Sequence, residues 1–194
     1  NRGIGVDWQP DARTTLLAEV VHRRYERPRF NPDLVLDPVR ETVIRAIANR
    51  TIGSRFAVGI EATSDLYSRR QPFVAPGGTP DAVPLQVLTT ALSPSVRWFH
   101  DAGWFAISTV NVGRQRVVRD AFYTNQGTSN FETLDLAAGW RRPGSASFVA
   151  IEVRNAFDRR FPFQDDSFRA SEARPDLVRF LPVRMLWIRA GLEF

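Results

Sequence analysis

The chain has 194 residues, of which 43% are hydrophobic and 24% charged, a balance that is typical of a folded domain and argues against disorder. It contains no cysteine, which excludes disulfides and cysteine-based zinc sites. All 26 basic residues are arginines, and they are spread among 21 acidic residues instead of forming a patch, so we expect no nucleic-acid partner despite the net charge of +5.

Alternation with a period of two residues recurs along the whole chain and predicts an all-β protein. Apolar runs reach only about five residues, far too short for a transmembrane helix, whereas a membrane-spanning strand needs only about 9 to 11 residues of alternating character. We predict nine strands, in chain order, over residues 3–9, 13–25, 39–49, 55–67, 85–99, 104–116, 130–141, 147–157 and 177–194.

The connections between these strands alternate in length. Short turns rich in Gly, Pro and Asp fall at 10–12, 50–54, 100–103 and 142–146, and long segments fall at 26–38, 68–84, 117–129 and 158–176. An up-and-down barrel with tight turns on one rim and extended loops on the other has this organisation. We therefore predict an antiparallel, up-and-down transmembrane β-barrel in the bacterial outer membrane, in contact with its lipid.

Aromatic residues lie at the predicted strand ends. A girdle of four tryptophans adjoins the short turns, and a second group is predicted at the opposite ends; two such bands are typical of anchoring at the two membrane interfaces. In the alternative, a soluble lipocalin-like binder, each tryptophan closes the end of a water-excluding core. The first group is Trp8, Trp98, Trp104 and Trp140, and the second is Tyr25, Tyr67, Phe131 and Phe157.

The two faces of each predicted strand differ in polarity. Charged residues alternate with apolar ones, so we assign the charged face to the lumen and the apolar face to lipid. Arg24 and Arg40 break this rule near the long-loop rim, where snorkelling accommodates them. The candidate lumen-facing residues, for a pore or a plug contact, are Glu61, Asp65, Arg97, Asp135, Glu152, Arg154, Arg189 and Glu193.

The chain ends in strict alternation on an aromatic residue. The alternating apolar residues of this last strand resemble the C-terminal signal of bacterial outer-membrane proteins, a resemblance that implies recognition by the barrel-assembly machinery. A complete bacterial barrel has an even number of strands, so the nine strands of residues 1–194 are expected to be the C-terminal portion of a larger barrel whose N-terminal part is absent. The signal comprises Leu186, Ile188, Ala190, Leu192 and Phe194.

The segment VAIEVRNAFD and the terminal strand together resemble the end of TonB-dependent receptors. The match rests on Val153, Asn155, Phe157 and Asp158, with Ala156 in place of the usual Leu. The resemblance implies a barrel of about 22 strands that imports a small molecule such as a siderophore, cobalamin or sugar. It also implies contact with TonB through an N-terminal plug that lies outside these residues.

A second resemblance leads to a different role. SVRWFHDAGWFAIS and LDLAAGWRRPGSASFVAIEVRNAFD are similar to the receptor-like barrels of some tetratricopeptide-repeat outer-membrane proteins. In that case the barrel is an anchor or an export pore for a periplasmic helical-repeat domain, with a structural or interaction role.

Catalytic chemistry is not expected. His22 and His100 are the only histidines, and His100 with Ser95 and Asp101 is better interpreted as a solvated turn than as a hydrolase site. The acids at 165–166 and the glycines at 75–80 are interpreted as loop residues, not as a calcium site or a phosphate loop. We therefore predict no enzyme, no cofactor and no metal.

Overall fold

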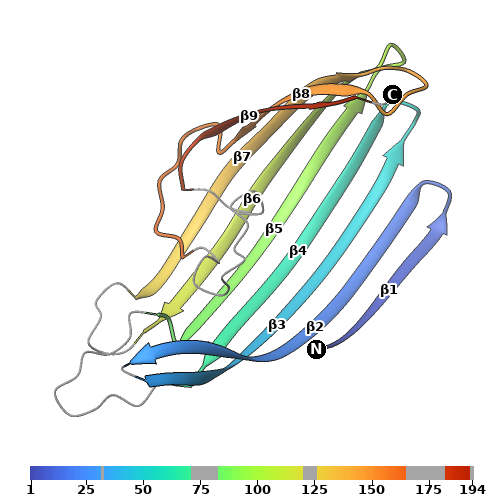
Figure 1. Cartoon of the computed structure of the whole chain (residues 1–194). Helices are drawn as coiled ribbons and strands as arrows, with labels where there is room; N and C mark the ends of the chain where they lie inside the picture. Colours follow the sequence, from blue (N-terminus) through green and yellow to red (C-terminus); the bar gives the residue numbers. More distant parts are fainter. Residues whose placement is uncertain (32, 71–82, 120–125, 165–181, 193–194) are drawn as a thin grey trace.

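The computed structural model describes residues 1–31, 33–70, 83–119, 126–164 and 182–192. These residues form a single antiparallel sheet of nine strands, in which each strand pairs with the next in the chain (Figure 1). Among them, no helix is long and apolar enough to cross a bilayer. The strands are β1 (Arg2–Asp11), β2 (Thr14–Asn31), β3 (Asp33–Ile52), β4 (Phe56–Arg69), β5 (Gln86–Phe99), β6 (Trp104–Val118), β7 (Gly127–Arg141), β8 (Phe148–Arg154) and β9 (Met185–Gly191).

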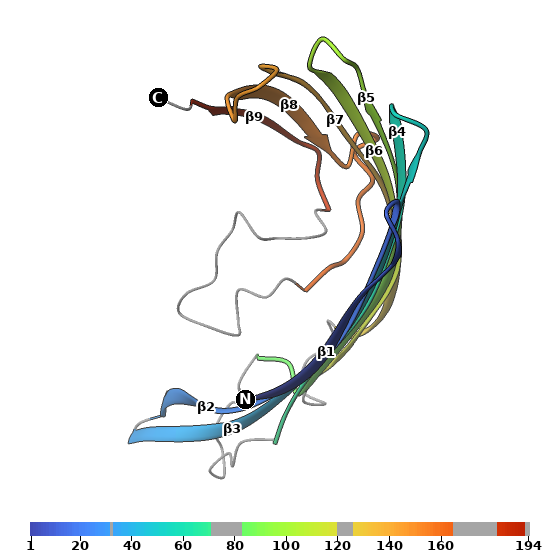
Figure 2. The same ribbon diagram turned by 90° about the vertical axis from the view of Figure 1, so that its right-hand side faces the viewer.

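The sheet curls into an open arc (Figure 2), and β1 and β9 are its two edge strands. The segment that follows β8 runs inside the arc, which defines a concave and a convex face. The predicted all-β, up-and-down antiparallel architecture is confirmed.

In Figure 1 the β1–β2, β3–β4, β5–β6 and β7–β8 turns lie together at one end of the sheet, as predicted for the short connections, and β2 and β3 meet at the other end. In the first short turn the Asp11 carboxylate accepts hydrogen bonds from the Arg13 backbone N–H, at 2.7 Å, and from the Thr14 hydroxyl, at 3.1 Å. The Arg13 hydrogen bond is the main reason that the pKa of Asp11 lies below its usual range.

The predicted loop at 26–38 is wrong, because β2 and β3 continue through it as a two-stranded hairpin. Pro38 sits opposite Glu26 in this hairpin, and β4 pairs with β3 only from Val39 onward. Pro38 therefore lies where one edge of β3 has no neighbouring strand, and a missing N–H is tolerated there. The hairpin extends beyond the rest of the sheet (Figure 2).

The last two strands are shorter than predicted. β8 ends at Arg154 because Asn155 and Asp158 adopt φ of 48° and 51°, in the left-handed region that interrupts an extended strand. β9 pairs with β8 only over Met185–Gly191, and residues 165–181 and 193–194 lie outside the described part of the chain.

Glycines opposite aromatic residues accompany the curvature. Phe105 faces Gly139, and Phe131 faces Gly113, both on the concave face. A Cβ on Gly139 would lie 2.4 Å from the Val149 carbonyl oxygen and 2.7 Å from the Phe105 ring. Each aromatic ring fills the space that a side chain on the facing glycine would occupy. Side chains on the inner face of the curved sheet can therefore lie close together without steric overlap.

This crowding gives a testable consequence. Gly139→Ala should destabilise the folded sheet by about 1–3 kcal/mol, because the added methyl group overlaps a backbone oxygen that cannot move without breaking the β7–β8 ladder. Gly5→Ala is the matched control, since its Cβ would have no neighbour closer than 3.4 Å. Urea unfolding measures the free energy of unfolding of both variants; equal values would contradict the packing argument.

Candidate functional site

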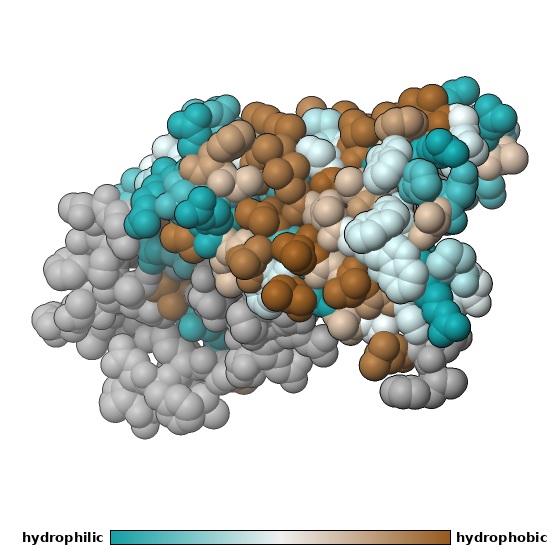
Figure 3. Space-filling view, turned by 90° about the horizontal axis from the view of Figure 1, so that it is seen from above, coloured by the Kyte–Doolittle hydropathy of each residue, from teal (hydrophilic) through white to brown (hydrophobic). Residues whose placement is uncertain are grey.

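The convex face of the sheet is apolar and exposed. Val149, Ile151 and Ile188 have 46%, 52% and 73% of their surface accessible, whereas the Glu152 and Arg154 side chains on the concave face are only 19% and 20% accessible. This distribution is the reverse of a protein whose apolar side chains form a water-excluding core. Figure 3 shows apolar side chains gathered across the surface, with hydrophilic ones toward its margins.

Three arginines and one tryptophan limit this apolar surface, which we call the apolar band. On β3 its boundaries are Arg40 and Arg50, and on β6 they are Trp104 and Arg114. Ten residues separate the two boundaries on each strand, which corresponds to roughly 33 Å of extended chain. The convex residues of the band include Leu16, Ala18, Val20, Ile44, Ala46, Ala48, Val58, Ile60, Ala62, Leu92, Val96, Val110, Val112, Leu134, Leu136, Val149, Ile151, Leu186 and Ile188.

The band crosses the strands obliquely. The cross-strand register leads from Arg40 through Ser68 and Gln86 to Val118 on β6. The boundary on β6 is instead at Arg114, four residues closer to the short turn. One boundary of the band is therefore displaced along the strands between β3 and β6.

The other boundary is displaced by the same amount. Arg50 is in register with Ser108 on β6, and Trp104 lies four residues farther toward the short turn. Four residues are about 13 Å along a strand, and the three strand spacings from β3 to β6 are about 14 Å. The strands are therefore inclined to the normal of the band by about 43°, and the band is about 24 Å high.

Four tryptophans follow the short-turn boundary of the band. Trp104 and Trp140 are register partners, and Trp98 is in register with Phe56. With Trp8 on β1, all four predicted girdle residues face the convex side, where Trp8 and Trp104 are 59% and 57% exposed.

The predicted second aromatic band at the long-loop end is wrong. Tyr67 and Phe131 are 0% and 4% exposed on the concave side, and Tyr25 packs beside Tyr67. Phe157 is exposed in the segment after β8. Alternation in the sequence assigns Tyr25, Tyr67 and Phe131 to the same face as the charged residues. The packing of that inner face cannot be predicted from the sequence.

The concave face carries paired charges. Arg45 lies between two carboxylates, 2.7 Å from Glu61 and 3.8 Å from Glu19. Glu152 accepts from Arg154 at 2.6 Å and lies 2.9 Å from Arg189. Each set joins neighbouring strands across the inner surface.

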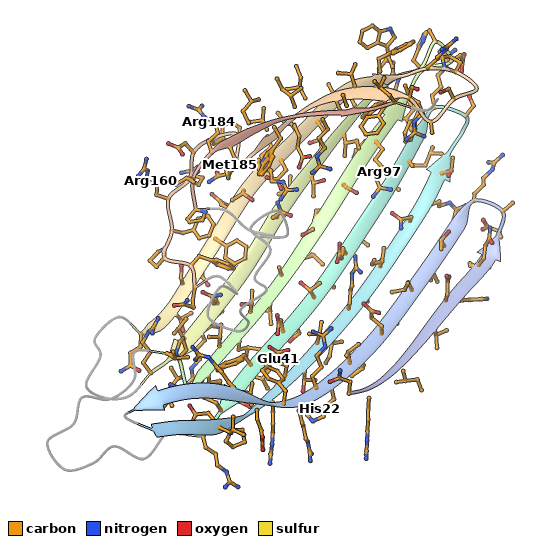
Figure 4. The ribbon with its side chains drawn as sticks, viewed as in Figure 1. His22, Glu41, Arg97, Arg160, Arg184 and Met185 are labelled. Atoms are coloured by element: carbon orange, nitrogen blue, oxygen red, sulfur yellow. The ribbon has the colours of Figure 1, made fainter. Side chains whose placement is uncertain are left out.

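The remaining lumen candidates also lie on the concave face. The Asp135 carboxylate accepts from the Asn111 amide at 2.9 Å and from the Asn155 backbone N–H at 2.8 Å. Asp65 is on the same face of β4 as Glu61, and Arg97 rises from β5 in the concave view of Figure 4. None of the ion pairs among the described residues involves Arg97, and Glu193 lies outside the described residues.

A buried polar cluster at the long-loop end was not predicted from the sequence. The Arg69 guanidinium is buried, 3.2 Å from Asp37, and donates to the Pro84 carbonyl at 3.0 Å. Tyr25 donates to Glu41 at 2.8 Å, and Figure 4 shows Glu41 on the inner side of the sheet. Only the tertiary pairing of β2, β3 and β4 brings these residues together.

The segment after β8 folds back onto the concave face. Gln115 donates to the Gln164 carbonyl at 2.9 Å and accepts from the Gln164 N–H at 2.6 Å. Phe131 stacks on Phe161 at 5.1 Å and meets Phe163 edge-on at 5.6 Å. Sequence reasoning missed this contact, although the Phe-Pro-Phe triplet in a long connection is a signal that could have indicated it.

The other predicted sites have the following positions. Leu186, Ile188 and Ala190 of the terminal signal face the convex side of β9, and Leu192 is exposed directly after the strand. Phe194, the acids at 165–166 and the loop at 75–80 lie outside the described residues.

The structure does not assemble Ser95, His100 and Asp101 as a triad. Asp101 pairs with Arg55 at 2.7 Å, and His100 Nδ1 accepts from the Ala102 N–H at 3.1 Å, within the turn. Within the described part of the chain, no cluster of three or more His, Asp or Glu residues is placed to hold a metal ion.

Comparison with protein-family models, curated proteins and solved structures finds no match for this chain. The functional interpretation therefore rests on the two faces of the sheet.

The inner ion pairs can be tested by neutralising Glu152. Glu152→Gln removes the shared partner of Arg154 and Arg189 and should cost about 1–3 kcal/mol of folding free energy, because these groups are partly shielded from water. Glu132→Gln is the control: its pair with Arg159 is exposed and 3.7 Å long, so its loss should cost less than about 0.5 kcal/mol. Urea titration measures the free energy of unfolding of both variants, and an equal cost for the two would contradict a structural role for the inner cluster.

Proposed function

We propose that this chain forms part of the wall of a bacterial outer-membrane β-barrel that serves transport, similar to TonB-dependent receptors. The convex apolar band would face lipid, and the concave polar face would line the lumen. The localisation, the lipid contact and the barrel-assembly partner all belong to this proposal.

The dimensions of the apolar band carry the proposal. Its height of about 24 Å agrees with the apolar band of about 25 Å on outer-membrane barrels, and the strand inclination of about 43° lies within their range of about 35–45°. The inclination comes from the displacement of the boundary residues between strands, and the height combines this inclination with their spacing along a strand. A water-soluble sheet has no physical reason to satisfy both.

Two further observations support an outer-membrane setting. The tryptophans of the short-turn end face outward, where amphipathic rings prefer the membrane interface. The exposed, alternating Leu186, Ile188 and Leu192 keep the sequence pattern of the C-terminal signal on the face expected to contact lipid.

Transport is supported by the inner face. Charged and amide side chains line the concavity, and the returning segment at Phe161–Gln164 occupies only part of it. Lumens that carry polar solutes are lined in this way, whereas a barrel that only anchors a domain needs no such lining. The resemblance at Val153, Asn155 and Phe157 favours an importer with an N-terminal plug and TonB contact, and its ligand is an unidentified small molecule.

The membrane assignment is tested by placing arginine on adjacent residues of β5. Leu92 is 44% exposed on the convex face, and Ser93 faces the lumen opposite Glu61. Leu92→Arg should destabilise the protein folded in lipid vesicles by about 2–4 kcal/mol, whereas Ser93→Arg should fold as the parent does. Protease protection and heat-modifiable gel mobility report folding. Equal folding of both variants, or a protein that is monomeric without detergent, would overturn the assignment.

Transport is tested by conductance, in planar bilayers, of the closed barrel that contains this chain. Arg97→Glu should shift the reversal potential toward cation selectivity, because it reverses a concave charge that has no ion pair among the described residues. Arg142→Glu, in an exposed turn, is the control and should change selectivity less. Folded, inserted protein without any conductance would instead favour the anchoring role.

A further inference from the structure

Two sets of arginines, one on each face of the sheet, differ in their partners. On the concave side, five arginines have carboxylates within 4 Å. On the convex side of β2, β3 and β6, beyond the apolar band at the long-loop end, four exposed arginines take part in none of the ion pairs among the described residues. The concave set is Arg23, Arg45, Arg69, Arg154 and Arg189, and the convex set, which we call the arginine belt, is Arg24, Arg40, Arg114 and Arg116.

The belt brings like charges together. Arg24 and Arg40 are direct cross-strand partners, an arrangement that is destabilising without an anion nearby. Arg114 and Arg116 share one face of β6 and have neutral partners on both neighbouring strands. The partners are Thr90 and Asn130 for Arg114, and Leu88 and Thr128 for Arg116.

Acidic side chains on the convex face do not neutralise the belt. Glu26 lies two residues beyond Arg24, and Glu132 lies within 3.7 Å of Arg159, which follows β8. Arg24 donates from Nε to His22 Nε2 at 3.1 Å, while His22 Nδ1 contacts the Thr42 hydroxyl at 3.0 Å. In Figure 4, His22 projects from the outer margin of the sheet. This contact orients the Arg24 guanidinium and supplies no negative charge.

We propose that the arginine belt binds the phosphate groups of lipid headgroups on the long-loop side of the membrane. The inference rests on the proposed membrane function and deepens it. A headgroup phosphate beside the belt would sit directly beyond the apolar band, so that the acyl chains of the same lipid lie along the band. Guanidinium groups bind phosphate in a bidentate manner, which suits four exposed arginines without acidic partners.

The two boundaries of the apolar band then have different chemistry. Four tryptophans follow the short-turn boundary, which also includes Arg50 on β3, whereas the long-loop boundary on β3 and β6 is marked by arginine alone.

The experiment uses the closed barrel that contains this chain and compares its binding of phosphatidate with that of phosphatidylcholine in neutral detergent, measured by native mass spectrometry. The variant carries Arg24→Gln, Arg40→Gln, Arg114→Gln and Arg116→Gln. Affinity for phosphatidate should fall about fivefold for each arginine removed, and the fall should shrink at high salt. The control variant removes the same charge from the short-turn end, with Arg13→Gln, Arg50→Gln, Arg141→Gln and Arg142→Gln, and should retain phosphatidate as the parent does.

Insertion into phosphatidylcholine vesicles is measured first for all three proteins. If none inserts, the proposed membrane function fails and the inference fails with it. If all insert and the two variants lose phosphatidate equally, or the parent shows no preference for phosphatidate, only the lipid site is overturned. Inorganic phosphate that binds as tightly as phosphatidate would also overturn it, because the belt would then be a site for a free anion.

Discussion

The fixed cross-strand register is the constraint on which the rest of this structure depends. Because every strand pairs with its neighbour in register, each residue has one face, and a shift of one residue would exchange the two faces of a strand. Ile60, Leu92 and Val112 stay on the convex side, and Glu61, Asn111 and Asp135 stay on the concave side. The apolar band, the tryptophan boundary and the inner ion pairs all follow from that register.

Two constraints act on the side chains of the inner face and not on those of the outer face: crowding and the partial removal of charges from water. The side chains of the inner face converge because the sheet is curved, and glycines opposite Phe105 and Phe131 provide the space. Its charges are partly removed from water, and pairs such as Glu152 with Arg154 compensate for that loss. The segment after β8 also packs on the concave face, where Gln115 binds it by hydrogen bonds and Phe131 by ring stacking. The concave surface is therefore ordered rather than merely hydrated.

The sequence predicts most of this fold because its signals are local. Alternation identifies each of the nine strands, and Gly, Pro and Asp identify the short turns. Prediction from the sequence fails where the structure depends on more than local pattern. The hairpin through Pro38 exists because one edge of β3 has no neighbouring strand there. The end of β8 depends on the left-handed φ of Asn155. The seven described lumen candidates could be assigned to a face, but Arg45 and Asn111, the partners of Glu61 and Asp135, lie on other strands, so only the register reveals them.

Closure of the proposed barrel follows from strand direction. In an up-and-down sheet β1 and β9 run the same way, so pairing their edges directly would give a parallel seam. Unpaired backbone groups cost several kcal/mol each in hydrocarbon, so both edges need partners in a membrane. Antiparallel closure requires an odd number of additional strands between β9 and β1. A total that is even agrees with bacterial single-chain barrels, and the open arc in Figure 2 leaves room for such strands.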